Sequence, residues 1–453
     1  MKTGGKGNTG TQKKGFWGFI DNIEGDKVVW IIVFLLIMIS ILAIFSSTSL
    51  LKEGSKDRMD FVTEHIVIVG IGLGIIFGLY NVKKIGLFRI LSQFGFAVSL
   101  ALLGLLASHV DIDGVLEAER INGAWRTIRI AGFQLHVFEV VKVAMVLYLA
   151  WAIHAFKEGR LKHGSTDLKK RIIYMYAPIG IVCGLTLLGS GSSAVFIGAI
   201  LIATLLIGGV PFKEIAAIGA IGLVGLLIIV GAYNATGGKM FRRFERIATI
   251  TSRVGADYDA SERLKEVTPR SREFYEILDE IKQPYSAKIA VHEGRLLGKS
   301  SGNSTQKYVV SNIYGDYMFS FLVEEYGLIG GILVIFLYVS LLARGSTIAR
   351  LCTNEYAKIA VGGLSVLITG QAFMHMFVNV DIGPMTGQTL PLISHGSFAF
   401  LVFCIAFGVI LAISRMASKR IKEEQEAAIP IYDSTKDDIQ ASMDILEHID
   451  RDL

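Results

Sequence analysis

The sequence is poor in charge and cysteine, and it lacks the common nucleotide and zinc motifs. Only 19% of its 453 residues are charged. No Walker loop, HExxH or CxxC is present, and no GxGxxG opens a helix after a strand. We therefore expect any chemistry to be driven by neither a nucleotide nor zinc. Cys183, Cys352 and Cys404 fall in apolar segments or a short basic loop, which excludes an external disulfide framework and predicts small buried residues.

Hydrophobic residues, in contrast, make up 52% of the chain, and the mean hydropathy of +0.52 is too apolar for a soluble protein of this length. Apolar runs of about 18 residues or more recur, each long enough to cross a hydrocarbon layer about 30 Å thick. Because the alternating pattern of a β-barrel is absent, these runs predict helices. We expect an all-α polytopic membrane protein with ten transmembrane helices over residues 28–47, 62–81, 86–107, 134–156, 172–189, 192–209, 213–233, 317–343, 358–378 and 397–415.

Lysine and arginine orient these helices, because they collect in alternate short loops and near both termini. Examples are Lys83, Lys84, Arg344 and Arg350. Basic short loops stay in the cytoplasm, so we expect both termini there. We attribute the pI near 8.9 to this topology and to contact with anionic membrane lipid, not to nucleic-acid binding. The first apolar run is too long for a cleavable signal and no cleavage site follows it.

The segments outside the helical region 28–415 differ in composition. Residues 1–27 are rich in Gly, Lys and Thr and are predicted to be disordered. Residues 416–453 form a cytoplasmic tail that turns acidic, either a solvated tail or a docking segment. Residues 234–316 form one large loop on the outer side; such a loop between short connections is usually functional.

Two opposite charges, Glu139 and Lys142, lie three residues apart in the fourth predicted helix and so share a face. Charges inside a membrane helix are costly and mark a site or a buried pair. Two interpretations stay open: an ion pair that fixes packing, or the wall of a substrate cavity in which Lys142 meets a phosphate. Arg126 and Arg129, just outside this helix, suit either headgroup anchoring or, with Lys142, diphosphate binding.

Three carboxylates, Asp316, Glu324 and Glu325, stand at the edge of the eighth apolar run, in YGDYMFSFLVEEYGLIGG (314–331). Asp316 suits either a first-turn acid favoured by the helix dipole or a general base at the membrane surface. On a helix, Glu324 lies about 80° round from Asp316 and Glu325 about 180° away. The stretch 316–325 fits the membrane helix or a short helix above it. For the two glutamates, holding the loop and shaping a cavity both remain open.

The preceding segment 283–307 mixes Gly, Ser, Asn and Gln with four basic residues, Lys288, Arg295, Lys299 and Lys307. It suits a solvated loop or, better, a mouth that binds a polar, anionic headgroup.

Taken together, these motifs resemble the SEDS family (shape, elongation, division and sporulation), which includes the FtsW and RodA glycosyltransferases of bacterial cell-wall synthesis. The resemblance covers roughly residues 28–415. The similar stretches are NGAWR (122–126) to NGAxRW, FQLHVFEVVK (133–142) to FQPSExxK, GNSTQK (302–307), GDYMFSFLVEEYGLIGG (315–331) to TDFIFAxxxEELGxxG, and GPMTGQTLPLISHG (383–396) to PxTGxxLPxxSYGG. The chain departs from the family at GSGSSA (189–194), where the family has PDxGT.

The resemblance implies an inverting glycosyltransferase that polymerises lipid II, an undecaprenyl-diphosphate-linked disaccharide peptide, into glycan strands at the outer face of the bacterial cytoplasmic membrane. It places Asp316 on the family's catalytic aspartate. The substrate contacts that we expect on this basis are Arg126, Glu139, Lys142, Lys288, Gln306, Thr386 and Ser394. No cofactor is certain; Mg²⁺ or Mn²⁺ at the diphosphate is compatible with the sequence, which shows no definite ligand set.

Of the two main branches, the division enzyme FtsW is favoured by GNSTQK, TLPLIS and the extended charged N-terminus, with the elongation enzyme RodA close behind. The family also implies a partner, a class B penicillin-binding protein transpeptidase, besides other divisome proteins. Two rival classes remain. A lipid II flippase or transporter would also carry charges in a span and helix breakers near the ninth and tenth spans. A non-catalytic scaffold is the other rival.

Overall fold

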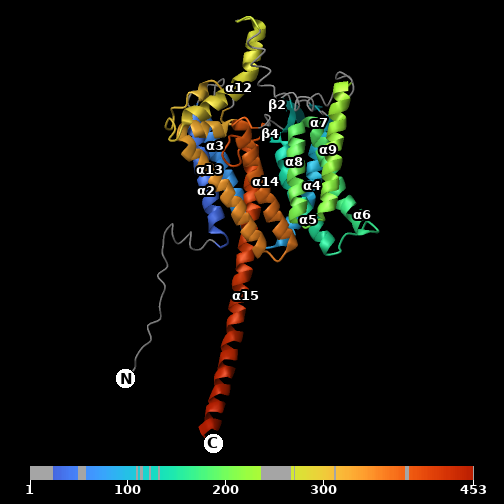
Figure 1. The fold of residues 1–453 in the computed structure, drawn as a ribbon, viewed down its shortest axis with the longest axis vertical. Helices are drawn as coiled ribbons and strands as arrows, with labels where there is room; N and C mark the ends of the chain where they lie inside the picture. Colours follow the sequence, from blue (N-terminus) through green and yellow to red (C-terminus); the bar gives the residue numbers. More distant parts are fainter. Residues whose placement is uncertain are drawn as a thin grey trace.

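The computed structural model describes residues 24–48, 58–108, 111–112, 116–121, 124–130, 133–235, 267–269, 271–310, 313–382 and 387–451. Each of the ten predicted ranges holds a helix, so the helix prediction is confirmed (Figure 1). These helices are α2 (Lys27–Ser47), α3 (Arg58–Tyr80), α4 (Ile85–Ser108), α5 (Val137–Lys157), the continuous α6 (Asp167–Arg171), η1 (Ile172–Tyr176) and α7 (Ala177–Gly189), α8 (Gly191–Ile207), α9 (Phe212–Ala235), α13 (Met318–Leu351), α14 (Glu355–Asn379) and α15 (Ser397–Arg451).

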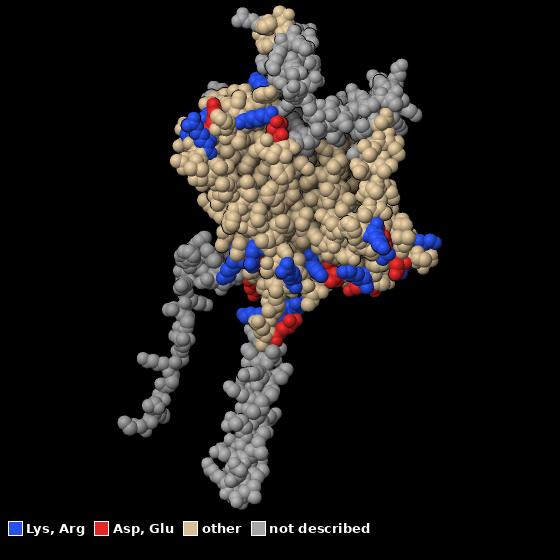
Figure 2. All heavy atoms as spheres, viewed as in Figure 1, with Lys and Arg blue, Asp and Glu red and all other residues tan. Residues whose placement is uncertain are grey.

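Eight helical segments among the described residues are long and apolar enough to cross a membrane. They exclude α8, which has 17 residues, and α9. Figure 2 agrees with this assignment: on the face shown, charged side chains gather at the two ends of the bundle and an uncharged band separates them. Such a band suits lipid, whose tails are as apolar as the Leu and Ile side chains that face them.

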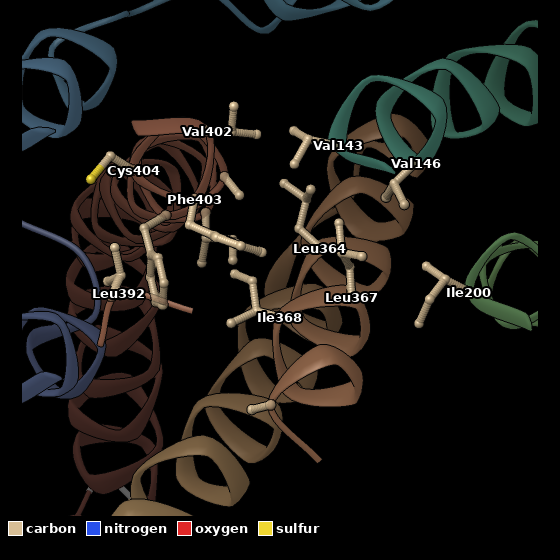
Figure 3. Packing of buried hydrophobic residues seen from close by; sticks show 14 of the residues in the cluster. Val143, Val146, Ile200, Leu364, Leu367, Ile368, Leu392, Val402, Phe403 and Cys404 are labelled. Atoms are coloured by element: carbon tan, nitrogen blue, oxygen red, sulfur yellow. The ribbon is translucent and has the colours of Figure 1, made fainter. Parts of the chain in front are cut away.

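The core of the bundle lies around α14, α5 and α15. Within their apolar windows, 61%, 89% and 78% of the residues are buried, against 28% for α4, so α4 lies at the periphery. Leu364 and Ile368 of α14 pack close to Val143 of α5 and Phe403 of α15 (Figure 3). The central position of α14 matters for the site, because polar residues on this helix are forced to find partners inside the protein.

The first and last helices meet at one end of the bundle. The carboxylate of Asp26 caps α2 by accepting from the amides of Val28 (2.9 Å) and Val29 (3.1 Å). The backbone N–H of Asp26 donates to Ser414 Oγ of α15 (2.8 Å), and Arg344 Nε of α13 donates to Asp26 Oδ2 (2.8 Å). The described start of the chain and the exit of α15 therefore share one side, as the alternation of basic loops predicts.

The opposite end carries a small sheet in the loop between α4 and α5, which the pattern of apolar runs does not predict; the rest of the described fold is helical. The strands β1 (Asp111–Ile112), β2 (Leu116–Ile121), β3 (Ala124–Ile130) and β4 (Phe133–His136) pair antiparallel in chain order. Because β4 runs directly into α5, the fourth predicted helix begins at Val137, three residues after its predicted start at residue 134.

Also at this end lies α12 (Arg272–Gly294), in the loop between α9 and α13 (Figure 1). Residues 236–266 of that loop lie outside the described part of the chain, as do residues 1–23, for which disorder is predicted. The tail from 416 continues α15 as a helix to Arg451.

Helix α13 is broken at Gly327, whose φ of 69° and ψ of −173° are not helical. The segment Met318–Tyr326 is therefore a short helix of its own, followed by the long apolar one. This outcome matches the second of the two possibilities for residues 316–325, a separate short helix ahead of the long one.

Candidate functional site

The ammonium group of Lys142 forms the centre of a buried polar network. It donates to Glu139 Oε1 (2.7 Å), to Gln388 Oε1 (2.8 Å) and to Gln371 Oε1. An ammonium group has three N–H donors, so these three oxygens use all of them. Lys142 is only 2% exposed, and its charge is offset by Glu139, whose other oxygen has no hydrogen-bond partner among the residues that the structure describes.

The three partners of Lys142 come from different elements, which fixes the position of the cation. Gln371 belongs to α14 and also donates to the carbonyl of Thr389 (3.1 Å). Gln388, in the loop before α15, also donates to Ser193 Oγ near the start of α8 (3.3 Å). An anion that binds Lys142 must therefore replace one of these oxygens, and the neutral glutamines cost less to displace than Glu139.

Asp316 lies just before α13, is half-buried, and has a backbone that several elements hold. The side-chain amide of Asn379, at the end of α14, donates to the carbonyl of Asp316 (3.1 Å). Ser394 Oγ donates to the carbonyl of the preceding Gly315 (2.8 Å), and the amide of His395 donates to Tyr314 O (2.8 Å). The loop that contains Gln388 thus also fixes the segment that carries Asp316.

Arg126 of β3 reaches the same loop, since its guanidinium donates to Gly387 O at 3.5 Å. Gly387 has a φ of 60°, and a Cβ at this position would collide with that guanidinium. Only glycine allows this approach without strain. Arg129, by contrast, lies 46% exposed on the same strand, within 3.8 Å of Glu117, so the sequence pair Arg126 and Arg129 separates in space.

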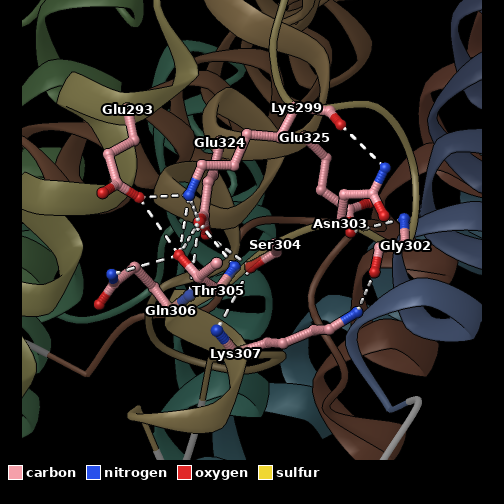
Figure 4. Close-up of polar contacts among 10 residues, drawn as sticks. All are labelled: Glu293, Lys299, Gly302, Asn303, Ser304, Thr305, Gln306, Lys307, Glu324 and Glu325. Atoms are coloured by element: carbon pink, nitrogen blue, oxygen red, sulfur yellow. Dashed lines mark hydrogen bonds and ion pairs between the residues drawn. The ribbon is translucent and has the colours of Figure 1, made fainter.

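Glu324 holds the loop that precedes it (Figure 4). Its carboxylate, which is fully buried, accepts from the backbone of Thr305 (2.8 Å), from Ser304 Oγ (2.5 Å) and from Lys299 Nζ (2.9 Å). A weaker bond comes from the amide of Gln306 (3.3 Å). The family-like stretch GNSTQK is therefore folded around a carboxylate of its own chain.

Glu325 also holds this loop, at Gly302 and next to α2. It is fully buried and accepts from Ser46 Oγ of α2 (2.6 Å) and from the amide of Gly302 (2.9 Å). Lys307, which is buried beside it, donates to Gly302 O (2.7 Å). Of the two roles left open for these glutamates, the structure supports holding the loop.

The break at Gly327 completes this attachment of the loop, because it frees helical backbone groups. The freed carbonyl of Glu324 accepts from the amide of Lys299 (2.9 Å), and the amide of Leu328 donates to Arg295 O (2.9 Å). A Cβ at Gly327 would overlap the backbone of the loop at Leu296. We refer to residues 295–307 together with Glu324 and Glu325 as the loop clamp.

The basic residues of the predicted headgroup mouth are mostly engaged within the protein. Lys299 bridges Glu324 and Glu293. Burial disfavours its charged form, but the hydrogen bonds to Glu293 and Glu324 outweigh burial and raise the pKa of Lys299. The hydrogen bond from Lys299 in turn lowers the pKa of Glu293. Lys288 of α12 pairs with Asp381, next to the end of α14.

The predicted site residues thus fall into two groups. Arg126, Glu139, Lys142 and Ser394 join Asp316 around α14 and the loop 387–396. Gln306 lies in the loop clamp, with its side-chain amide 3.5 Å from Thr305 Oγ1. Thr386 lies outside the described residues. Within the described ranges no three His, Cys, Asp or Glu side chains gather in a way that could hold a metal ion.

Sequence reasoning missed Gln371, His375, Asn379 and Gln388. The first three carried a usable signal: they stand four residues apart in the ninth apolar run, so they share a face of a buried helix. Gln388 had no such local signal, because its partner Lys142 lies 246 residues away in the chain.

Comparison with known proteins identifies the family of the chain. The family model for FtsW, RodA and SpoVE, described as "Cell cycle protein", matches residues 26–419. A relative from Enterococcus hirae, described as a probable peptidoglycan glycosyltransferase FtsW, is 26% identical over 416 residues, which cover 88% of this chain and 94% of the relative. A relative from Coxiella burnetii with the same description is 28% identical over 400 residues, which cover 85% and 95%.

Two solved structures have a similar fold. One belongs to work on the structural coordination of polymerization and crosslinking by a peptidoglycan synthase complex; its TM-score is 0.60 at 19% identity, covering 86% of this chain and 98% of that one. The other is the rod shape determining protein RodA of Thermus thermophilus, with a TM-score of 0.56 at 20% identity, covering 87% and 98%. The chain is a multi-pass membrane protein, and because the family model spans most of it, the chain belongs to the family of FtsW, RodA and SpoVE cell cycle proteins.

Proposed function

We propose that this protein is a peptidoglycan glycosyltransferase that polymerises lipid II into glycan strands. The observation that carries the proposal is a continuous set of hydrogen bonds that connects the half-buried Asp316 to the buried cation Lys142, through Asn379, His375 and Gln388. A half-buried acid connected in this way to a buried cation suits a transfer from a diphosphate, which needs a base for the attacking hydroxyl and a cation for the leaving group. The names of the relatives from Enterococcus hirae and Coxiella burnetii support the same reaction.

In the reaction, Asp316 accepts the proton of the attacking sugar 4-hydroxyl. The hydroxyl oxygen forms a bond to the anomeric carbon of the donor, while the bond from that carbon to the diphosphate breaks. The electron pair of that bond leaves with the diphosphate, and the anomeric centre is inverted. A positioned base of this kind typically contributes about 10²- to 10⁴-fold to the rate.

The cations act on the leaving group. Lys142 and Arg126 stabilise the charge that develops on the diphosphate, with Lys142 exchanging a glutamine oxygen for a phosphate oxygen. Glu139 keeps Lys142 charged and oriented. Lys288 also binds the diphosphate once its ion pair with Asp381 breaks. The remaining proposed substrate contacts are Gln306, Thr386 and Ser394. Ser394 also fixes the loop before α15 against Gly315.

We further propose that all ten helices, α8 and α9 included, cross the bacterial cytoplasmic membrane within a domain of residues 28–415. The end with the sheet and α12 then faces outward, and residues 1–27 and the tail 416–453 are cytoplasmic. Basic side chains at the end where α2 begins support this orientation (Figure 2). The branch that we favour is FtsW, in septal synthesis, with RodA as the alternative. The peptidoglycan synthase complex with a similar fold supports a class B penicillin-binding protein as partner.

The proposal is tested with purified protein and lipid II. We expect no glycan strands from Asp316→Ala or Asp316→Asn, and normal strands from the matched control Glu355→Gln, a carboxylate at the opposite end of α14 that pairs with Lys157 near the surface. Polymerisation by Asp316→Asn at the wild-type rate would remove the base from the mechanism.

A lipid II transporter is the second candidate, favoured by the Glu139–Lys142 pair inside a predicted span. Headgroup translocation in liposomes distinguishes it. Translocation that survives Asp316→Ala but is lost in Lys142→Met would support the transporter.

A further inference from the structure

The residue at the N-cap position of helix α13 does not cap the helix with its side chain. Tyr317 occupies the N-cap position and makes no side-chain cap hydrogen bond. The first N–H groups of a helix have no partner within the helix, and leaving them unpaired in a buried place is costly. This helix start matters because Asp316 immediately precedes it.

The cap is supplied by α14. The amide of Phe319 donates to His375 Nε2 (3.3 Å), and the amide of Ser320 donates to Asn379 Oδ1 (2.9 Å). His375 and Asn379 stand one turn apart on α14, and each is 1% exposed. Two side chains of one helix thus cap the start of another.

The amide of Asn379 serves both sides of this junction. Its oxygen accepts from the backbone and the hydroxyl of Ser320, and its nitrogen donates to Asp316 O and to His375 O (2.8 Å). Position 379 therefore needs both an acceptor and a donor. An aspartate of the same shape has no donor and would place a second acceptor against Asp316 O.

His375 extends the connection toward the cation. Because Nε2 accepts a backbone N–H, the proton of the neutral ring lies on Nδ1, which donates to Gln388 O (2.7 Å). The side chain of Gln388 accepts from Lys142. His375 therefore contacts both the start of α13 and the loop that contacts Lys142.

We propose that His375 and Asn379 are positioning residues that cap α13 from α14 and fix Asp316 at a set distance and angle from Lys142. The inference rests on the proposed function, since it concerns the same base and cation. Both side chains are only 1% exposed, so we assign neither a contact with the substrate. Their loss should lower kcat and leave KM close to its wild-type value, because the groups that bind the diphosphate remain in place.

The test measures initial rates of lipid II polymerisation at varied lipid II. We expect Asn379→Ala and His375→Ala to lower kcat on the order of 10²-fold, the loss typical of a reacting group displaced by about 1 Å. Asn379→Asp should lower it as well. His375→Gln should restore most of kcat, because its amide can accept from Phe319 and donate to Gln388. Thr369→Val is the matched control: its hydroxyl also joins α14 to α13, by donating to Tyr338 O (3.2 Å) away from Asp316.

Wild-type kcat in both alanine variants would overturn the inference, as would a raised KM at unchanged kcat or an equal loss in Thr369→Val. If the alanine variants fail to fold, the other two variants test the inference: we expect a low kcat for Asn379→Asp and a near-normal kcat for His375→Gln. Asp316→Asn separates the two proposals. If it is inactive while the Asn379 and His375 variants are normal, only the positioning inference fails. If the wild type itself forms no glycan strands from lipid II, the proposed function fails.

Discussion

Substituting Glu324 should release the loop clamp while leaving the bundle folded. In the structure this carboxylate is fully buried and accepts from Lys299, Ser304 and the backbone of Thr305. Glu324→Ala removes the acceptor for all of them and leaves Lys299 without its buried partner. Removing one partner of a buried ion pair costs about 3–5 kcal/mol, and the lower end applies here because Lys299 is 25% exposed and keeps Glu293 as a partner. At 1.36 kcal/mol per factor of ten, about 3 kcal/mol corresponds to about 10²-fold in the population of the open loop.

Hydrogen exchange of backbone amides measures that opening directly, because it reports local unfolding as well as global unfolding. The informative amides are those of Lys299, Ser300 and Thr305, which donate to acceptors on Glu324 and Glu325. In Glu324→Ala we expect their exchange to speed up by the factor above, while amides in the middle of α14 keep their protection.

The matched control is Glu293→Gln. Glu293 pairs with the same lysine, but its side chain is 39% exposed, and exposed pairs contribute only about 0–1 kcal/mol. Equal acceleration in Glu293→Gln and Glu324→Ala would refute the reasoning that burial decides the energy. Unchanged protection in Glu324→Ala would show that Glu324 does not hold the loop.

Three further predictions concern single sites. Gly327→Ala should lower the thermal midpoint in detergent and expose the loop clamp to protease, because φ is 69° and the new Cβ meets the loop backbone; Gly104→Ala, at a helical position with open space, should not. Lys142→Met should abolish polymerisation and destabilise the fold by leaving the buried Glu139 without its cation, whereas adding Glu139→Gln should recover stability but not activity. For Glu293, whose pKa is lowered in the folded state, the contribution to stability is present above the unfolded pKa of about 4.3 and is lost as the pH falls through the lower folded value. Thermal midpoints taken across this range should fall more steeply in the wild type than in Glu293→Gln, and parallel curves would contradict the prediction.

The helices could be predicted from the sequence because hydrophobic length is a local property that the membrane enforces. The sheet could have been predicted as well. Residues 116–130 contain Asn-Gly between two stretches of alternating polarity, LEAERI and AWRTIRI, which is a strong hairpin signal.

The site was only partly predictable, for a different reason. The spacing of Glu139 and Lys142 correctly indicated a shared face and a pair. No spacing could reveal that Lys142 also binds two glutamines from distant segments, since those contacts depend on how α5, α14 and the loop before α15 pack together. Likewise, helical geometry separated Glu324 from Glu325 but could not show that each faces a different part of one loop.

The polar face of α14 explains why these contacts occur together. Gln371, His375 and Asn379 follow one another at intervals of one turn on a helix whose other sides are packed with apolar residues. Each therefore has to find hydrogen-bond partners inside the protein. Gln371 accepts a hydrogen bond from Lys142, His375 donates to the loop before α15, and Asn379 donates to the carbonyl of Asp316. A buried helix with such a face holds a cation and a carboxylate from other helices in fixed relative positions, although it supplies no charge of its own to the site.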